Sequence, residues 1–277
     1  MAVAVAFGSA DAASIAEQIA NRKATEIAAP DFTKKKPAKI PTTGPLKFVK
    51  AAQNKIIDED RWLAENAGGQ ADPVKDKAES LGFPTTVEGS SLYQLVCDNA
   101  GDKYIAMYGY FEKEPLLMII TNGERTEVEH YLNFENFKWT PVKGTRYAYS
   151  NLFLKWARVV DDVLYVSYGH NTYASSSEGM TGYLTAISLK DYSILWTSGS
   201  TTSYGSFDFS YNRIIAGYGF TDEPDFVYVL DKKTGKYIQQ FKLRKGPDYI
   251  VVRGDNVYVR TYSLDYTFRI RAGVSGK

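Results

Sequence analysis

The chain has 277 residues, with 33 Lys and Arg against 32 Asp and Glu, and 44% of its residues are hydrophobic. A formal net charge of +1 argues against a chain-wide field that would attract nucleic acid or an anionic membrane, and no apolar run reaches the roughly 18–20 residues that span a bilayer. One cysteine excludes an intrachain disulfide, and two histidines argue against a multi-histidine site. We therefore expect no metal and no organic cofactor.

Composition divides the chain into two parts. All 21 tyrosines lie at or after Tyr93, whereas 18 of the 26 alanines lie in the first 92 residues. Alanine favours helices and tyrosine favours strands. We therefore predict an N-terminal arm over residues 1–85, with short helices and a Lys/Pro-rich linker, followed by a β-rich repeat domain over residues 86–277.

The arm carries a helix start signal near its beginning. Ser14 followed by Glu17 forms a capping-box pattern ahead of an apolar run, which predicts a short helix. A segment rich in lysine and proline follows, and we interpret it as a hydrated linker rather than a site for nucleic acid. A second helix is predicted over residues 46–64.

A short pattern recurs four times in the second part. An Asp or Asn stands six residues before a tyrosine, with apolar or small residues dominating between them, and the starts are 60, 50 and 44 residues apart. Periods of 40–50 residues are typical of propeller blades. The four copies are 102–109, 162–169, 212–219 and 256–263.

One strand before each copy and two after it give four antiparallel strands per repeat. We predict a mainly β fold, a small or partial β-propeller of about four four-stranded antiparallel blades preceded by the helical and extended arm. A two-layer sandwich is the alternative.

The segment Phe226-Val-Tyr-Val-Leu-Asp231, followed by Lys-Lys-Thr234-Gly235-Lys236, resembles the blade signature of the quinoprotein-like β-propeller superfamily. Residues 183–196 look like a degenerate copy. The resemblance implies a fold over about residues 90–272. Members with eight blades bind pyrroloquinoline quinone and calcium, and many others are protein-binding scaffolds.

The fourth repeat ends with its third strand, which contains Tyr266, Phe268 and Ile270. Its outer strand has to come from elsewhere, or its edge stays open for a partner. Two segments could supply the strand. One is the alternating run with Leu46, Phe48 and Val49, and the other is 85–88.

No sequence pattern of a serine hydrolase, a nucleotide-binding loop or a zinc protease is present, so we expect no enzyme. An aromatic ring follows the Tyr-Gly pair in three repeats, at Tyr110, His170 and Phe220. We predict that these rings form a ligand or partner surface. Packing of the strand ends against the next blade is the alternative.

These observations favour a non-catalytic structural or interaction protein. It would dock into a larger homo- or hetero-oligomer through its arm and open blade edge, as in a phage virion or tail. An extracytoplasmic bacterial propeller acting as a binding or assembly factor is the alternative. A quinone-dependent or glycan-active enzyme is a third possibility. The N-terminus lacks a convincing signal peptide because no basic residue precedes its short apolar run.

Overall fold

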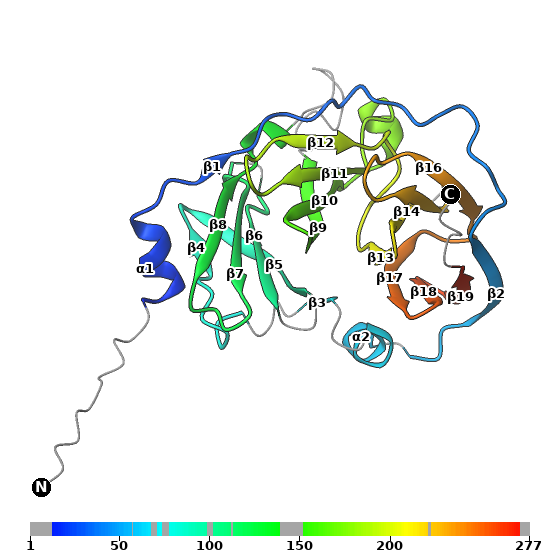
Figure 1. Ribbon diagram of the computed structural model, residues 1–277, viewed down its shortest axis with the longest axis horizontal. Helices are drawn as coiled ribbons and strands as arrows, with labels where there is room; N and C mark the ends of the chain where they lie inside the picture. The colour runs from blue at the N-terminus through cyan, green and yellow to red at the C-terminus, as the bar shows by residue number, and fades with distance from the viewer. Residues whose placement is uncertain are drawn as a thin grey trace, which may run out of the picture.

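The computed structural model describes residues 13–56, 58–67, 71–73, 78–98, 102–111, 113–138, 152–220 and 223–271. Strands predominate in these residues and form four sheets, which are arranged around a common centre (Figure 1). No helix in the described part of the chain is long and apolar enough to cross a membrane.

Each sheet contains a meander of antiparallel strands, here called a blade. The inner strands are β5 (Ser90–Asp98), β9 (Leu152–Val160), β13 (Asp208–Ser210) and β17 (Pro247–Arg253). The second strands are β6 (Lys103–Tyr108), β10 (Val163–His170), β14 (Arg213–Tyr218) and β18 (Asn256–Thr261). The third strands are β7 (Leu117–Asn122), β11 (Tyr183–Ser188), β15 (Phe226–Asp231) and β19 (Leu264–Ile270). The outer strands are β8 (Val128–Asn133), β12 (Ile194–Thr197), β16 (Tyr237–Lys242) and β2 (Leu46–Gln53).

The second strands are the segments that the repeated Asp/Asn-to-Tyr pattern predicts. All six residues of β14 are buried, and the last four of β6 are buried as well. Strands of this kind need apolar side chains on both faces, because a neighbouring blade lies on each side. The predicted partial propeller of four four-stranded blades is confirmed.

Further short elements complete the described structure. The strands β1 (Thr25–Glu26), β3 (Ala71–Pro73) and β4 (Thr86–Val87) join the first sheet. The helices are α1 (Ile15–Ala20) and α2 (Glu59–Ala67), and the 3-10 helices are η3 (Glu135–Phe137) and η4 (Ala174–Ser177). The predicted capping box of α1 is present, because Ser14 and Glu17 bond reciprocally.

The fourth blade is completed by the arm. β2 pairs antiparallel with β19, with Leu46 opposite Ile270 and Gln53 opposite Leu264. Leu46 packs among the buried side chains of blades three and four, which include Phe268. Of the two predicted donors the first supplies this strand, whereas β4 of the second pairs with β5 in the first blade.

Two expectations are therefore wrong. The edge formed by Tyr266, Phe268 and Ile270 is not open, since β2 covers it and all three side chains are at most 5% exposed. The helix predicted over residues 46–64 is a strand in its first half, and only residues 59–67 are helical. Pairing with β19 overrides the helical pattern because it satisfies the backbone along one edge and buries Leu46.

The arm between α1 and β2 follows the outer side of the molecule and contacts each blade in turn (Figure 1). β1 pairs parallel with β8 in the first blade, and the Phe32 carbonyl accepts a hydrogen bond from the Tyr183 hydroxyl in the second at 2.6 Å. The Pro41 carbonyl accepts one from the Gln240 backbone in the third at 2.8 Å. We call residues 25–45 the strap. The arm contacts its own chain over this length, and docking to other subunits through the arm stays a prediction.

The proposed domain boundary near residue 85 stays a prediction, and three strands from residues 25–73 pair with the sheets. The helix α2 lies between the first and fourth blades, where it contacts β3 on one side and β17 on the other. Its buried Trp62 and Leu63 pack with Val251 of β17. This helix thus fills the gap that four blades leave.

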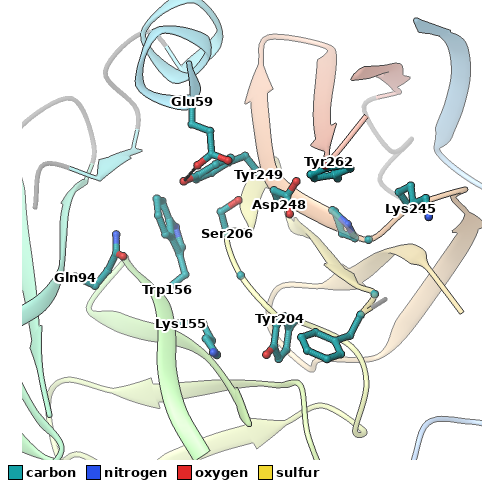
Figure 2. Close-up of a pocket in the computed structure, with 15 residues that line it drawn as sticks. Glu59, Gln94, Lys155, Trp156, Tyr204, Ser206, Lys245, Asp248, Tyr249 and Tyr262 are labelled. Carbon is teal, nitrogen blue, oxygen red and sulfur yellow. Dashed lines mark hydrogen bonds between the residues drawn. The ribbon is translucent and has the colours of Figure 1, made fainter. Parts of the chain in front are cut away.

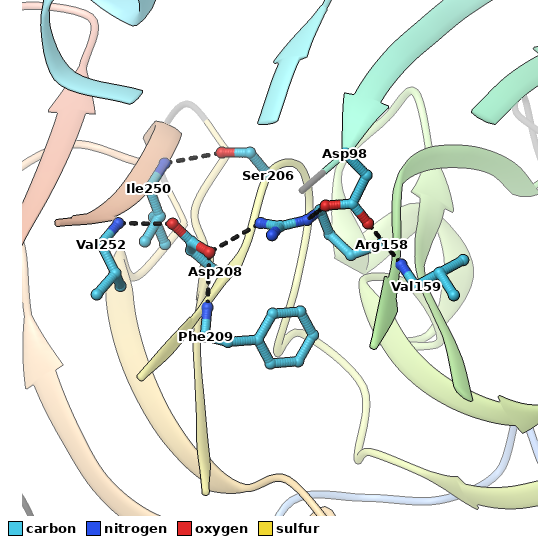
Figure 3. Close-up of polar contacts among 8 residues, drawn as sticks. All are labelled: Asp98, Arg158, Val159, Ser206, Asp208, Phe209, Ile250 and Val252. Carbon is cyan, nitrogen blue, oxygen red and sulfur yellow. Dashed lines mark hydrogen bonds and ion pairs between the residues drawn. The ribbon is translucent and has the colours of Figure 1, made fainter. Parts of the chain in front are cut away.

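A buried ion-pair network joins the inner strands (Figure 3). Arg158 on β9 bonds to the Asp98 carboxylate at the end of β5, and its Nη1 lies 2.8 Å from Oδ1 of Asp208 on β13. The carboxylate of Asp208 also accepts the backbone N–H of Val252 on β17 at 2.6 Å. One connected set of polar contacts therefore reaches all four blades.

Candidate functional site

A pocket of about 610 Å³ opens at the centre of the molecule, where the inner strands begin (Figure 2). Inner strands contribute Gln94, Trp156 and Tyr249, and the segment before β13 contributes Ser206. Second strands run antiparallel to the inner ones, so the residues after them reach the same end of the propeller. All four blades therefore build this pocket, which we call the central pocket.

Aromatic side chains form much of its wall. Trp156 is only 4% exposed, whereas Tyr262, which follows β18, is 87% exposed at the rim. Tyr204 packs edge-on against Phe220, with ring centroids 5.5 Å apart. Rings of this kind give a ligand large rigid contact areas at a low entropic cost.

Opposite charges enter the pocket from different elements. Glu59 comes from α2, and its carboxylate accepts a hydrogen bond from the Tyr249 hydroxyl at 3.1 Å. Burial raises the pKa of the Asp248 carboxyl to about 6, with a further contribution from the Glu59 charge. In Figure 2 these acids lie on the side of α2, and Lys155 lies on the opposite side.

Lys155 is half-buried on β9 and lies over two rings. Its Nζ is 4.7 Å from the centroid of Tyr204 and 5.8 Å from that of Phe153, and it donates to the Asn171 side chain. Burial lowers the pKa of the Lys155 ammonium to about 7. The side chain can therefore change its charge near neutral pH while it faces the pocket.

Trp156 supplies an unused donor. Its buried Nε1 has no hydrogen-bond partner among the described residues. A buried N–H without an acceptor costs free energy, so such groups are found where water or a ligand oxygen completes the bond. The wall of the central pocket therefore offers one fixed donor among its rings.

The structure brings two of the three predicted surface residues onto one run of rings. Tyr110 is 49% exposed and packs on Phe153 at 5.8 Å, and Lys155 links Phe153 to Tyr204 and thus to Phe220. The ring of His170 is fully buried and is not part of the surface, although its carbonyl accepts the Tyr204 hydroxyl at 2.5 Å.

Tyr173 is the exposed ring of the second blade instead. It follows β10, is 37% exposed and packs edge-on against Phe220 at 5.2 Å. An aromatic residue thus follows the second strand of every blade. We call these four residues the aromatic rim: Tyr110, Tyr173, Phe220 and Tyr262.

The other predicted residues lie elsewhere. Leu46 is buried under blade four, whereas Phe48 and Val49 are each 49% exposed on β2. None of these three residues lines the central pocket. Lys155, Trp156, Asp248 and Tyr249 were not predicted as site residues. Their place in the pocket could have been inferred from the sequence, because the first residues of each repeat's inner strand meet at the centre of a propeller. Glu59 could not have been inferred in this way, because only the docking of α2 places it there.

The described pocket residues contain no nucleophile paired with a base. The lining includes neither histidine nor cysteine, and Ser206 Oγ accepts the backbone N–H of Ile250 at 2.7 Å. In the part of the chain that the structure describes, no group of three or more His, Cys, Asp or Glu side chains could hold a metal ion. The arrangement is suited to binding by stacking, hydrogen bonds and charge.

Comparison of the sequence with protein-family models finds no match, and comparison with curated proteins finds none. Solved structures that are similar include the WD40 β-propeller domain of Doa1, at 13% identity and a TM-score of 0.41 over 66% of this chain and 52% of that one. BamB from Moraxella catarrhalis is similar at 10% identity and a TM-score of 0.35, over 64% of this chain and 69% of that one.

A quinohemoprotein alcohol dehydrogenase from Pseudomonas putida HK5 is similar at 9% identity and a TM-score of 0.39, over 70% of this chain and 42% of that one. The chain thus spans about half the length of the WD40 and quinohemoprotein chains. Each of these three TM-scores is below 0.5.

Proposed function

We propose that this protein is a non-catalytic interaction scaffold that binds a partner protein at the aromatic rim and the central pocket. The observation that carries the proposal is the aromatic residue after the second strand of each of the four blades. Contiguous apolar patches with polar residues around them mark interaction sites, and interface anchors are enriched in Tyr and Trp.

The rigidity of the frame supports this role. The Asp98–Arg158–Asp208 network and the strap connect the blades, which supports a rigid frame under the four rim residues. A preorganised surface loses little conformational entropy when it binds. The mixed charges of Glu59, Asp248 and Lys155 would then orient the partner.

A more specific role as a phage virion or tail component, and the alternative role as an extracytoplasmic binding or assembly factor, differ in assembly state. A permanent virion component is purified as a large homo- or hetero-oligomer, whereas a binding factor is purified as a monomer that associates reversibly. Native mass measurement of the full chain distinguishes these two roles.

The rim itself is tested with the full chain purified together with its partner from the native source and rebuilt from the separated components. Tyr262→Ala should weaken binding by about tenfold or more, as expected for an interface anchor. The matched control is Tyr211→Ala, because Tyr211 is also an exposed tyrosine, at 59%, but lies in the turn between β13 and β14. Equal affinities of the two variants would contradict the proposal.

A further inference from the structure

The strap does not cover the outer edge of the fourth blade in the described part of the chain. The outer strand β8 is paired with β1, and β16 receives the Pro41 carbonyl at its Gln240 backbone N–H. β2 is itself the last strand of the fourth sheet, and seven of its eight residues are exposed. It lies at the outer margin of the molecule in Figure 1. The open edge is therefore that of β2 and not that of β19.

The direction of the backbone groups along β2 follows from two hydrogen bonds at its ends. The Asn54 N–H donates to the Ser263 carbonyl, and the Arg271 N–H donates to the Pro45 carbonyl, both at 3.1 Å. In an antiparallel pair, hydrogen-bonded and non-hydrogen-bonded residues alternate. When this alternation is followed inward from both ends of β2, four residues fall in non-hydrogen-bonded pairs. The N–H and C=O groups of these residues point away from β19: Leu46, Phe48, Ala51 and Gln53.

An independent contact supports this assignment at Leu46. Its N–H and C=O both bond to the Gln239 side chain, at 2.8 and 2.9 Å, and not to β19. The remaining outward positions, at Phe48, Ala51 and Gln53, are on the exposed length of the strand. A register shift of the β2–β19 pair lies between Phe48 and Ala51, so an added strand pairs in regular alternation at Ala51 and Gln53 and follows the bulge before it reaches Phe48.

The surroundings of this edge are basic. Lys47 stands directly opposite Arg269 in the β2–β19 pair, and both are exposed. Like charges in this position repel each other unless an anion lies between them. A groove of about 410 Å³ over the β2–β19 pair is lined by Lys47, Arg269 and Arg271, and by a single acid, Asp255.

We propose that the outer edge of β2 binds an extended, acidic segment of another protein by strand addition. The backbone of the segment pairs with Phe48, Ala51 and Gln53, and its Asp or Glu side chains meet Lys47, Lys50 and Arg269. A second copy of this chain is a poorer occupant, because antiparallel pairing of two β2 strands brings lysine-rich edges together. Lysine on an edge strand is also known to oppose such self-association.

The test uses the immobilised full chain and two matched pools of synthetic peptides. One pool has glutamate at every second position with varied apolar residues between, and the other has lysine in place of glutamate. The acidic pool should bind about tenfold more tightly, by an amount that falls as salt rises. Peptides from the acidic pool with N-methylated backbones should lose binding. Absence of binding by the acidic pool, or equal binding by the methylated peptides, would overturn the proposal.

Two adjacent alanines supply a matched pair of variants. Ala51→Pro removes an outward N–H, so it should weaken peptide binding about five- to tenfold and leave the unfolding midpoint unchanged. Ala52→Pro removes an N–H that points to β19 and should lower the unfolding midpoint. If Ala51→Pro destabilises the fold as much as Ala52→Pro, the assigned backbone direction is wrong.

Native mass measurement tests the other possible occupant, a second copy of this chain. The parent chain should have the same oligomeric state as Ala51→Pro, because no second copy uses this edge. A dimer that becomes a monomer in Ala51→Pro would overturn the acidic partner in favour of self-pairing. The rim variant Tyr262→Ala should bind the acidic pool normally, so this surface and the aromatic rim can fail separately.

Discussion

Arg158 Nη1 of the second blade lies 2.8 Å from Asp208 Oδ1 of the third, and the same guanidinium bonds to Asp98 of the first. Arg158 is 4% exposed, so the charges meet where water does not screen them. The planar guanidinium can satisfy two carboxylates at once, which a lysine ammonium does with less geometric precision.

Replacing Arg158 by methionine should therefore destabilise the protein strongly. The change leaves Asp98 and Asp208 buried without their cation, and removing one partner of a buried pair typically costs about 3–5 kcal/mol. Urea unfolding measures this cost. Exposed Arg61, which pairs with Glu65 on α2, is the control, and Arg61→Met should cost no more than about 0.5 kcal/mol. Equal costs would contradict the structural role of the network.

Gly199→Ala should loosen the strap. A Cβ atom built at Gly199 would lie 2.3 Å from the backbone nitrogen of Lys36, so either the strap or the blade has to move. We expect a loss of about 1–3 kcal/mol and faster proteolysis between residues 25 and 45. Gly205→Ala is the control, because its nearest contact would be an ordinary 3.4 Å. Unchanged proteolysis of Gly199→Ala would show that the strap is not held there.

The free energy of unfolding should rise with pH above neutrality. The pKa of Lys155 falls from an ordinary 10.5 to about 7, and that of Lys36 to about 8, in both cases through burial. Between those values and about 10.5 the unfolded chain holds more protons than the folded one, so raising the pH stabilises the fold.

Lys155→Met should flatten this pH dependence, and the double variant with Lys36→Met should flatten it further. Thermal unfolding midpoints between pH 7 and pH 10 give the measurement, since both limits lie within the range set by the two lysines. If the unfolding midpoint rises with pH equally in the parent and in Lys155→Met, this lysine is not the cause of the pH dependence.

Leu46→Ala should destabilise the fourth blade much more than Val49→Ala. Leu46 is 2% exposed among Phe268, Ile270 and their neighbours, whereas Val49 on the same strand is 49% exposed. We expect about 2–5 kcal/mol for the buried leucine and about 0.5 kcal/mol for the valine. Both variants keep the backbone of β2, so the difference reports the burial of Leu46. Similar losses would contradict the packing of the arm under the blade.

Much of the blade structure could be predicted from local patterns. The repeated Asp/Asn-to-Tyr spacing predicted β6, β10, β14 and β18, because a strand between two blades needs apolar residues on both faces. The capping box at Ser14 was equally local, since the two partners are three residues apart. For the same reason the rim residues Tyr110 and Phe220 could be proposed from their position after a Tyr-Gly pair.

The sequence by itself thus determined which segments of the repeat domain become strands and roughly how many blades they form. Only the tertiary structure decided that Leu46–Gln53 closes the last blade, that His170 is buried, and that Glu59 faces Lys155 across a pocket. The physical reason is distance along the chain. A strand's periodicity reports which faces are buried but carries no information on its partner, and β2 and β19 are joined across more than two hundred residues by backbone bonds that any sequence can make.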